Sequence, residues 1–152
     1  MQTKRLILSM IAVLTLMMSA FIPAPAWKGD DILGNWYTDQ SKALVNIYKN
    51  KSDIYFGRIT WQKNPNEPDG SPKLDKENPD QKLRKNPILG LLILKGFKYE
   101  GDRWTDGTIY DPDNGKTYKC TITMENRNTL FVRGYVGISA IGRTTTWNRK
   151  TN

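Results

Sequence analysis

Apolar and polar side chains alternate with a period of two along most of the chain beyond residue 31. Residues 116–124 (KTYKCTITM), for example, place Cys120, Ile122 and Met124 on one face. Such alternation is typical of strands that bury one face, and no stretch beyond the first 26 residues repeats apolar positions at helical spacing. The pattern predicts an all-β domain of about eight short strands. They are expected at residues 32–38, 43–49, 54–61, 91–99, 103–110, 116–124, 129–135 and 143–149.

The connections between most of these strands are short and polar. EGD at residues 100–102 is typical of a hairpin loop, and DPDNG at residues 111–115 has the proline and the Asn-Gly pair of a tight turn. Short connections favour strands that follow one another in space, and pairing the last strand with the first removes both sheet edges. We therefore expect a closed eight-stranded antiparallel up-and-down barrel, whose interior holds side chains or one small ligand. A two-sheet sandwich is the alternative that the alternation also fits.

The connection between the third and fourth strands is long. Residues 62–86 (QKNPNEPDGSPKLDKENPDQKLRKN) contain four prolines and are almost entirely polar, and an apolar run over residues 88–94 follows them. A loop of this length is usually functional or disordered. We expect its polar residues to brace it, Asn86-Pro87 to start one helical turn, and the apolar residues to fold over or into one barrel mouth as a lid or plug. The candidate ligand-binding or lid residues are Asn78, Asp80, Arg84, Ile88, Leu89 and Leu91.

The first 26 residues have the features of a secretory signal peptide. Two cations precede an apolar run over residues 6–22, and the small-residue site Ala24-Pro25-Ala26 follows. A retained membrane span is the alternative, but the run is near the lower limit for crossing about 30 Å of hydrocarbon. We expect residues 1–26 to be removed. Residues 27–152 then form a single β-barrel domain, periplasmic or secreted, with no stable membrane insertion after cleavage.

The charged and reactive residues limit the kinds of functional site that the chain can form. The chain has 23 basic and 15 acidic residues, and without the two leader cations 21 basic residues remain, for a net charge of +6. Charges of both signs are interleaved, which favours a solvated surface, and core packing explains the aromatic residues more simply than base stacking does. The chain contains no histidine and a single cysteine, Cys120. This excludes an intrachain disulfide and Ser-His, Cys-His or His-zinc sites. No enzyme activity, cofactor, metal or nucleic-acid partner is expected.

Acidic residues suggest three sites, each of which has a simpler explanation. DPDNG at residues 111–115 does not place its glycine, or an acid at the twelfth position, where a calcium-binding EF-hand loop needs them. It is interpreted as a hairpin turn. Asp106 and Asp111 have the residue types of a glycosidase pair, but Asp106-Gly107 is more simply a strand bulge. The acids of the 62–86 loop would attract calcium, but interleaved lysines and arginines cancel their charge.

Arg133 is flanked at strand spacing by Phe131 and Tyr135 and has two interpretations. On an inward face its guanidinium would lie inside the barrel, where it needs a carboxylate ligand or an internal acid such as Asp106. On an outward face it is a surface residue. Arg133 and Tyr135 are therefore further candidate ligand-binding residues, with both orientations open.

Several stretches resemble known families. Gly34-Asn35-Trp36 is similar to the Gly-x-Trp signature of lipocalins, in which the tryptophan closes one barrel end beneath a basic residue of the last strand. This resemblance implies that Gly34, Trp36 and Arg149 close the barrel, with Arg149 stacked on the indole. Arg143 is the less favoured alternative for this cation. The whole chain beyond the leader resembles the bacterial exported family known as domain of unknown function 2147, which implies a calycin-like, lipocalin-like barrel and brings no established activity. The residues that carry this second resemblance are Gly34-x-Trp36, DKENPDQKLRKNPILGL (75–91), WTDGTIYDPDNGKTYKC (104–120) and LFVRGYVGISAIGRTTTWNR (130–149).

Two functional hypotheses follow from these features. The first is an exported lipocalin-like domain that binds a small, partly apolar ligand in or at the mouth of the barrel, by desolvation in a largely pre-formed site. The alternative is an envelope protein-protein interaction or inhibitor module that presents the 62–86 loop. A solvent-accessible interior favours the first hypothesis, and a filled interior favours the second.

Overall fold

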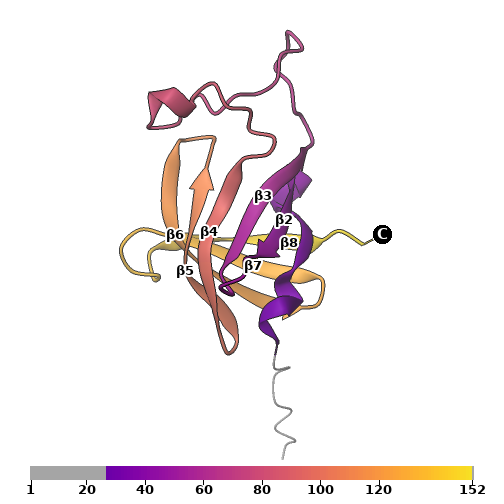
Figure 1. Ribbon diagram of the computed structural model, residues 1–152, viewed down its shortest axis with the longest axis vertical. Coiled ribbons are helices and arrows are strands. Elements are labelled where there is room, and N and C mark those ends of the chain that lie inside the picture. Colours follow the sequence, from indigo (N-terminus) through magenta and orange to yellow (C-terminus); the bar gives the residue numbers. More distant parts are fainter. Residues whose placement is uncertain (1–26, 152) are drawn as a thin grey trace, which may run out of the picture.

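Eight antiparallel strands close into a barrel in which each strand pairs with its neighbours in the chain and β8 pairs with β1 (Figure 1). The structure, a computed structural model, describes residues 27–151, so the predicted signal peptide at residues 1–26 lies outside the described residues. The predicted all-β up-and-down barrel is confirmed, and the two-sheet sandwich is not what the chain forms. The strands are β1 (Gly34–Tyr37), β2 (Ala43–Lys49), β3 (Tyr55–Gln62), β4 (Leu92–Glu100), β5 (Arg103–Asp111), β6 (Lys116–Asn126), β7 (Thr129–Tyr135) and β8 (Gly142–Arg149).

The first strand is shorter than predicted. Its expected beginning instead forms a short 3-10 helix, η1 (Gly29–Ile32), and β1 starts only at Gly34. The indole N–H of Trp36 donates a hydrogen bond to the carbonyl of Ile32 over 2.8 Å, which ties the helical turn to the strand that follows. Because Ile32 is buried, this turn covers one end of the barrel. We call it the closed end.

A bulge in β5 lies where the sequence predicted it. Asp106 has a φ of +60°, and the pairing of β5 with β6 shifts register between Trp104 and Gly107. Gly107 is required at the next position because a Cβ there would overlap the ring of Phe97. The bulge therefore lets an aromatic ring fill the barrel interior beside the backbone of β5.

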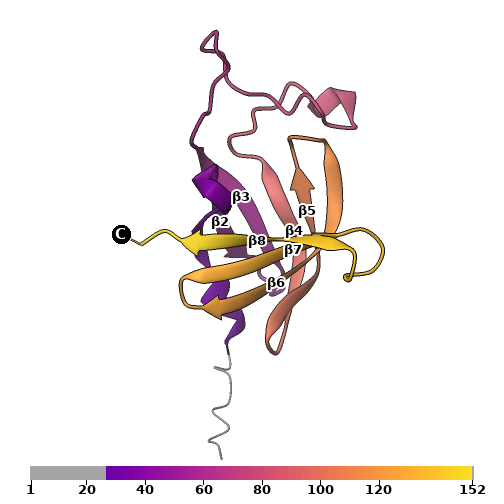
Figure 2. The ribbon, with the colours of Figure 1, turned by 180° about the vertical axis from the view of Figure 1, so that it is seen from behind.

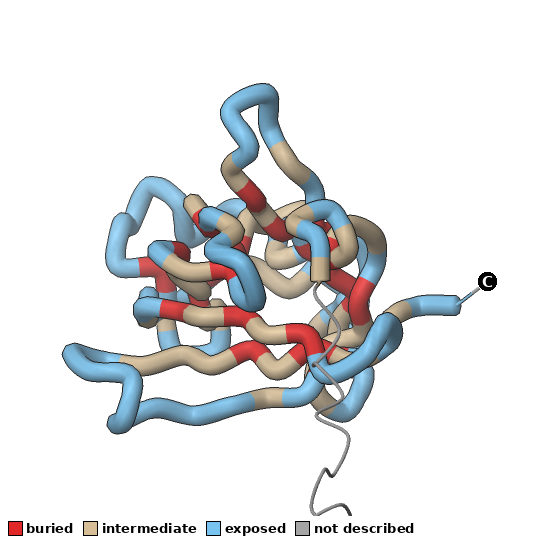
Figure 3. The backbone as a smooth tube through the Cα atoms, turned by 90° about the horizontal axis from the view of Figure 1, so that it is seen from below, coloured by how far each residue is buried: buried red, intermediate tan, exposed pale blue. Residues whose placement is uncertain are grey.

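Large aromatic side chains fill the closed half of the barrel. Trp36, Phe97, Trp104 and Trp147 are all buried. Seen from below, the buried positions gather around the interior, whereas the loops are exposed (Figure 3). This agrees with core packing as the explanation for the aromatic residues on the strands.

The long connection between β3 and β4, residues 63–91, is called the insertion here. It rises beyond the barrel end opposite to the first described residues (Figures 1 and 2). Two isolated bridges, Asn66 with Pro72 and Leu74 with Pro87, fold it back on itself. The helical turn predicted at Asn86-Pro87 is wrong. The turn that forms, η3 (Gln81–Leu83), begins earlier because the Asp80 side chain accepts the Lys82 backbone N–H and caps it.

Candidate functional site

The closed end is sealed by Trp36 and Arg149. The Arg149 guanidinium carbon lies 4.0 Å from the centroid of the Trp36 ring. The same guanidinium donates to the carbonyls of Leu33 and Arg127 at 2.8 and 2.7 Å. Partial burial lowers the pKa of Arg149 from its usual value, and the ring face and carbonyl oxygens compensate the buried charge. Gly34, which has a φ of +121°, starts β1 directly beside this guanidinium.

The inward face of the barrel changes from buried to accessible between the closed end and the opposite end. Cross-strand partners share a face, so the register identifies the inward positions. Partners Ile122 and Val132 are both buried. Ile109 and Tyr118, which are partners nearer the opposite end, are only half-buried. Inward-facing side chains are therefore less deeply buried at that end, which we call the barrel mouth. Its inward residues are Ala43, Gln62, Ile109, Tyr118, Gly134, Arg143 and Thr145.

The polar groups of the barrel mouth are few and incompletely paired. The Oε1 atom of Gln62 is buried and has no hydrogen-bond partner within residues 27–151. Thr145 donates its hydroxyl to the carbonyl of Val132 at 3.4 Å. Arg143 lies at the rim with its side chain 82% exposed, and its guanidinium is 4.0 Å from a carboxylate oxygen of Asp39. An apolar wall with a few convergent polar groups is the usual composition of a small-molecule site.

A buried carboxylate anchors the insertion at this same end. Asp75 is completely buried, and its two oxygens accept hydrogen bonds from the Tyr110 hydroxyl at 2.6 Å and the Asn78 amide at 2.7 Å. Burial, followed by the hydrogen bond to Asp75, raises the pKa of Tyr110. Gly115 of the β5–β6 turn has a φ of +69°, and a Cβ there would overlap the carbonyl of Glu77. The insertion is thus held closely against the end of β5 and β6.

The polar candidates of the insertion contact one another. Arg84 donates from Nε to the carbonyl of Asn78 at 2.7 Å, and the Asn78 side chain accepts the Asp80 backbone N–H at 2.9 Å. These three residues brace the loop as expected. Sequence reasoning did not single out Asp75, the acid that connects this brace to the barrel, because an acid within a charged run has no local signal of burial.

The apolar candidates of the insertion divide into two groups. Ile88 and Leu91 are partly buried and pack against the core cluster, and Leu91 accepts the backbone N–H of Ile59 on β3. Leu89, in contrast, is 50% exposed. Ile88 and Leu91 therefore join the core of the barrel, while the role of the segment as a lid stays a prediction.

Arg133 and Tyr135 lie on the outer face of β7, because the inward positions of that strand are Leu130, Val132 and Gly134. The Arg133 guanidinium donates to the carbonyls of Ser139 and Ala140 and to the Thr144 hydroxyl, at distances of 2.6–3.2 Å. It braces the β7–β8 loop and does not point into the barrel. The inward alternative is therefore not what the structure shows.

Asp106 and Asp111, the two acids weighed as a glycosidase pair, have separate structural partners. Asp106 is exposed and lies 3.3 Å from the Lys98 ammonium. Asp111 accepts the Asp113 backbone N–H and the Asn114 amide of its own turn. The first acid is committed to a strand bulge and the second to the tight turn predicted for DPDNG.

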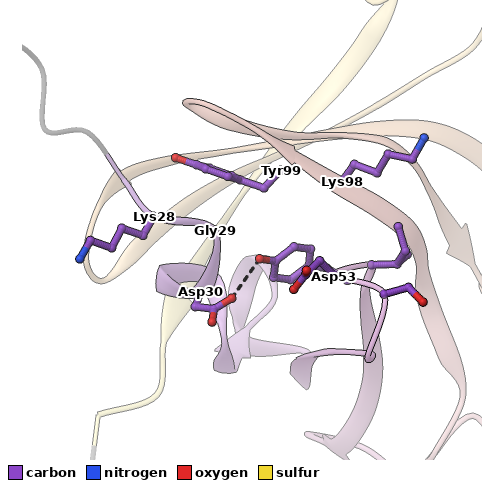
Figure 4. Close-up of a pocket in the computed structure, with 9 residues that line it drawn as sticks. Lys28, Gly29, Asp30, Asp53, Lys98 and Tyr99 are labelled. Carbon is purple, nitrogen blue, oxygen red and sulfur yellow. Dashed lines mark hydrogen bonds between the residues drawn. The ribbon is translucent and has the colours of Figure 1, made fainter.

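A separate cleft of about 620 Å³ lies at the closed end, between η1, the β2–β3 turn and β4 (Figure 4). Lys49 lies 2.8 Å from Asp30 and 2.9 Å from Asp53, and the Tyr55 hydroxyl donates to Asp30 at 3.0 Å. The hydrogen bond from Lys49 is the main cause that lowers the pKa of Asp30. Burial raises the pKa of Tyr55 to about 12. Since these polar groups already pair with one another, they hold η1 in place rather than await a ligand.

Comparison with known proteins agrees with this architecture. The family model described as "Uncharacterized protein conserved in bacteria (DUF2147)" matches residues 34–149. The chain belongs to this family. No curated protein matches the chain. Among solved structures it is similar to protein HP1028 from Helicobacter pylori, described as belonging to the lipocalin family. The identity is 23%, the match covers 79% of this chain and 84% of that one, and the TM-score is 0.67. This DUF2147 protein therefore has a lipocalin-like fold.

Proposed function

We propose that this DUF2147 protein is an exported, non-enzymatic binding protein that holds a small, partly apolar molecule at the barrel mouth. One observation carries the proposal: inward-facing residues are buried in the closed half of the barrel and half-buried at the mouth. The signal-peptide features of residues 1–26 support a periplasmic or secreted location.

Desolvation would supply most of the affinity. At about 25 cal/mol per Å², removing about 150 Å² of apolar ligand surface from water contributes roughly 4 kcal/mol. Ile109, Tyr118 and Ala43 provide the apolar wall for this contact. The Gln62 oxygen would accept a hydrogen bond from the ligand, and Arg143 at the rim would pair with an acidic group. These contacts suit an apolar body that carries a hydrogen-bond donor and an anionic end.

Two features of the chain support the non-enzymatic part of this proposal. The chain has no histidine, and its two candidate carboxylates, Asp106 and Asp111, are committed to separate structural contacts. A general acid-base pair would need two groups that face one reacting site.

Native mass spectrometry of the protein purified from its own host tests the proposal. We expect a co-purifying small molecule that is released on denaturation. Thr145→Trp should abolish its retention by filling the mouth, whereas Thr146→Trp, at the next and outward-facing position of β8, should retain it. Arg143→Glu is a second test, at an exposed position where packing is not disturbed. It should weaken retention, because the cation proposed to pair with the acidic group of the ligand is replaced by an anion. Wild-type protein that carries no small molecule, or equal retention by the two tryptophan variants, contradicts binding at the mouth.

A second candidate function is favoured by the anchored insertion. Asp75 fixes the insertion on the barrel while residues 68–72 at its tip remain exposed, as a surface presented to another macromolecule would require. This hypothesis predicts a stoichiometric protein partner in native mass spectra together with an empty mouth. Removing residues 68–71, which lie within the Asn66–Pro72 bridge, should release that partner and leave small-molecule retention unchanged.

A further inference from the structure

The β7–β8 loop exposes three aliphatic side chains. Val136, Ile138 and Ile141 are 68%, 65% and 70% exposed, more than any other large hydrophobic residue that the structure describes. The loop projects sideways from the barrel in both Figure 1 and Figure 2. Its sequence from residue 136 to 142, VGISAIG, contains no charged residue. Aliphatic side chains gathered on one projecting loop indicate a contact surface for another apolar phase or molecule.

Three carbonyl groups of this loop are paired from within the protein. Arg133 donates to the carbonyls of Ser139 and Ala140, and the Ile141 N–H donates to the carbonyl of Ile138. Unpaired backbone groups are what make an irregular loop costly to move out of water. Pairing three carbonyls lowers that cost for this loop.

Cations and an aromatic residue lie at the base of the loop. Tyr135 ends β7, and its cross-strand partner on β6 is the exposed Lys119. Arg143 follows the loop directly, and its side chain is 82% exposed. Basic residues beside exposed aliphatic residues complement anionic lipid headgroups, and tyrosine is enriched at the level of those headgroups.

We propose that residues 135–143 form a membrane-contact loop for an anionic bilayer surface. Val136, Ile138 and Ile141 enter the interfacial region of the bilayer, while Lys119 and Arg143 contact the headgroups. Contact through three side chains is reversible, because even a single fatty-acyl chain gives only marginal membrane binding. The loop joins the end of β7 to the start of β8. The proposal does not depend on whether the mouth binds a ligand.

Vesicle flotation of the chain without its leader tests this proposal. Wild-type protein should float with vesicles of equimolar phosphatidylglycerol and phosphatidylcholine, and less with phosphatidylcholine alone. Replacing Val136, Ile138 and Ile141 with serine should lower the partition coefficient by at least about tenfold. Leu83→Ser, which removes an exposed aliphatic side chain of the insertion, is the matched control and should not change it. Added salt should weaken binding of the wild type.

A site-specific label locates the contact. Because Cys120 is buried, a cysteine introduced as Ile138→Cys is labelled alone by an environment-sensitive dye. Its emission should shift to shorter wavelength with the anionic vesicles. Circular dichroism should show that the triple variant keeps its fold, since the three side chains are mainly exposed.

Three results would overturn the proposal. The first is wild-type protein that does not float with anionic vesicles. The second is a folded triple variant that floats as well as the wild type. The third is sedimentation that shows a wild-type dimer and a monomeric triple variant, with no flotation of either, because the loop would then be an interface between copies of this chain.

Discussion

The hydrogen bond between Tyr110 and Asp75 makes a quantitative prediction for the replacement Tyr110→Phe. The variant keeps the ring and removes only the hydroxyl that donates to Asp75 at 2.6 Å. Asp75 is completely buried, so water cannot replace this donor without opening the insertion. A buried hydrogen bond to a charged group is worth about 1.5–3 kcal/mol. We expect the free energy of unfolding to fall by about 2 kcal/mol and the melting temperature by roughly 6–12 °C.

Tyr118→Phe is the matched control. Its hydroxyl also has a side-chain partner, the amide of Asn114 at 3.1 Å, but that contact is exposed and neutral. The expected loss of stability is below about 0.5 kcal/mol. Urea denaturation measures both variants. Hydrogen exchange then tells whether Tyr110→Phe releases the insertion locally, because the backbone N–H groups of Asp75 and Ile88 are bonded only within the insertion.

A double-mutant cycle with Asp75→Asn isolates the interaction. If the two residues act through their shared hydrogen bond, the effects of Tyr110→Phe and Asp75→Asn should be non-additive by about 1 kcal/mol or more. Additive effects, or a Tyr110→Phe variant as stable as Tyr118→Phe, would refute the assignment of Asp75 as the anchor of the insertion.

Two further predictions concern the closed end. Arg149→Ala removes the guanidinium from the Trp36 ring and from the carbonyls beside it, and should lower the free energy of unfolding by about 2–4 kcal/mol in urea denaturation. An unchanged midpoint would show that the ring alone closes this end. For alkaline pH, the pKa of Tyr55 is raised to about 12 in the folded protein, against about 10 in the unfolded chain. The stability that neutral Tyr55 contributes is therefore complete below about pH 10 and is lost as the pH rises towards 12. Tyr55→Phe should reduce this decline in unfolding experiments, and an identical decline in both proteins would contradict it.

Strand positions were predictable because alternation is a local property. Residues 43–49 and 129–135 form β2 and β7 with the bounds that the pattern predicted. The error at residues 32–33 has a side-chain cause that alternation does not report: the Ile32 carbonyl at the end of η1 accepts the indole N–H of Trp36. A local apolar pattern does not distinguish a strand from a buried turn that is held by a side chain.

The candidate site was less predictable, because closure of the barrel decides which side chains point into the interior and which point outward. Arg133 between two aromatic residues fits either face, and only the register across β6, β7 and β8 shows that it points outward. Thr145 and Gln62 read as ordinary surface residues in the sequence, yet both face the interior at the mouth.

The sequence by itself determined the all-β class, the order of eight strands and the tight turns, because hydrophobic period and turn chemistry act between near neighbours. The resemblance to lipocalins brought together Gly34, Trp36 and Arg149, which closure of the barrel places side by side. Only the tertiary structure decided that Asp75 is buried and that the β7–β8 loop is exposed. Burial depends on which distant segments meet, and Asp75 pairs with Tyr110 only when the insertion packs against β5.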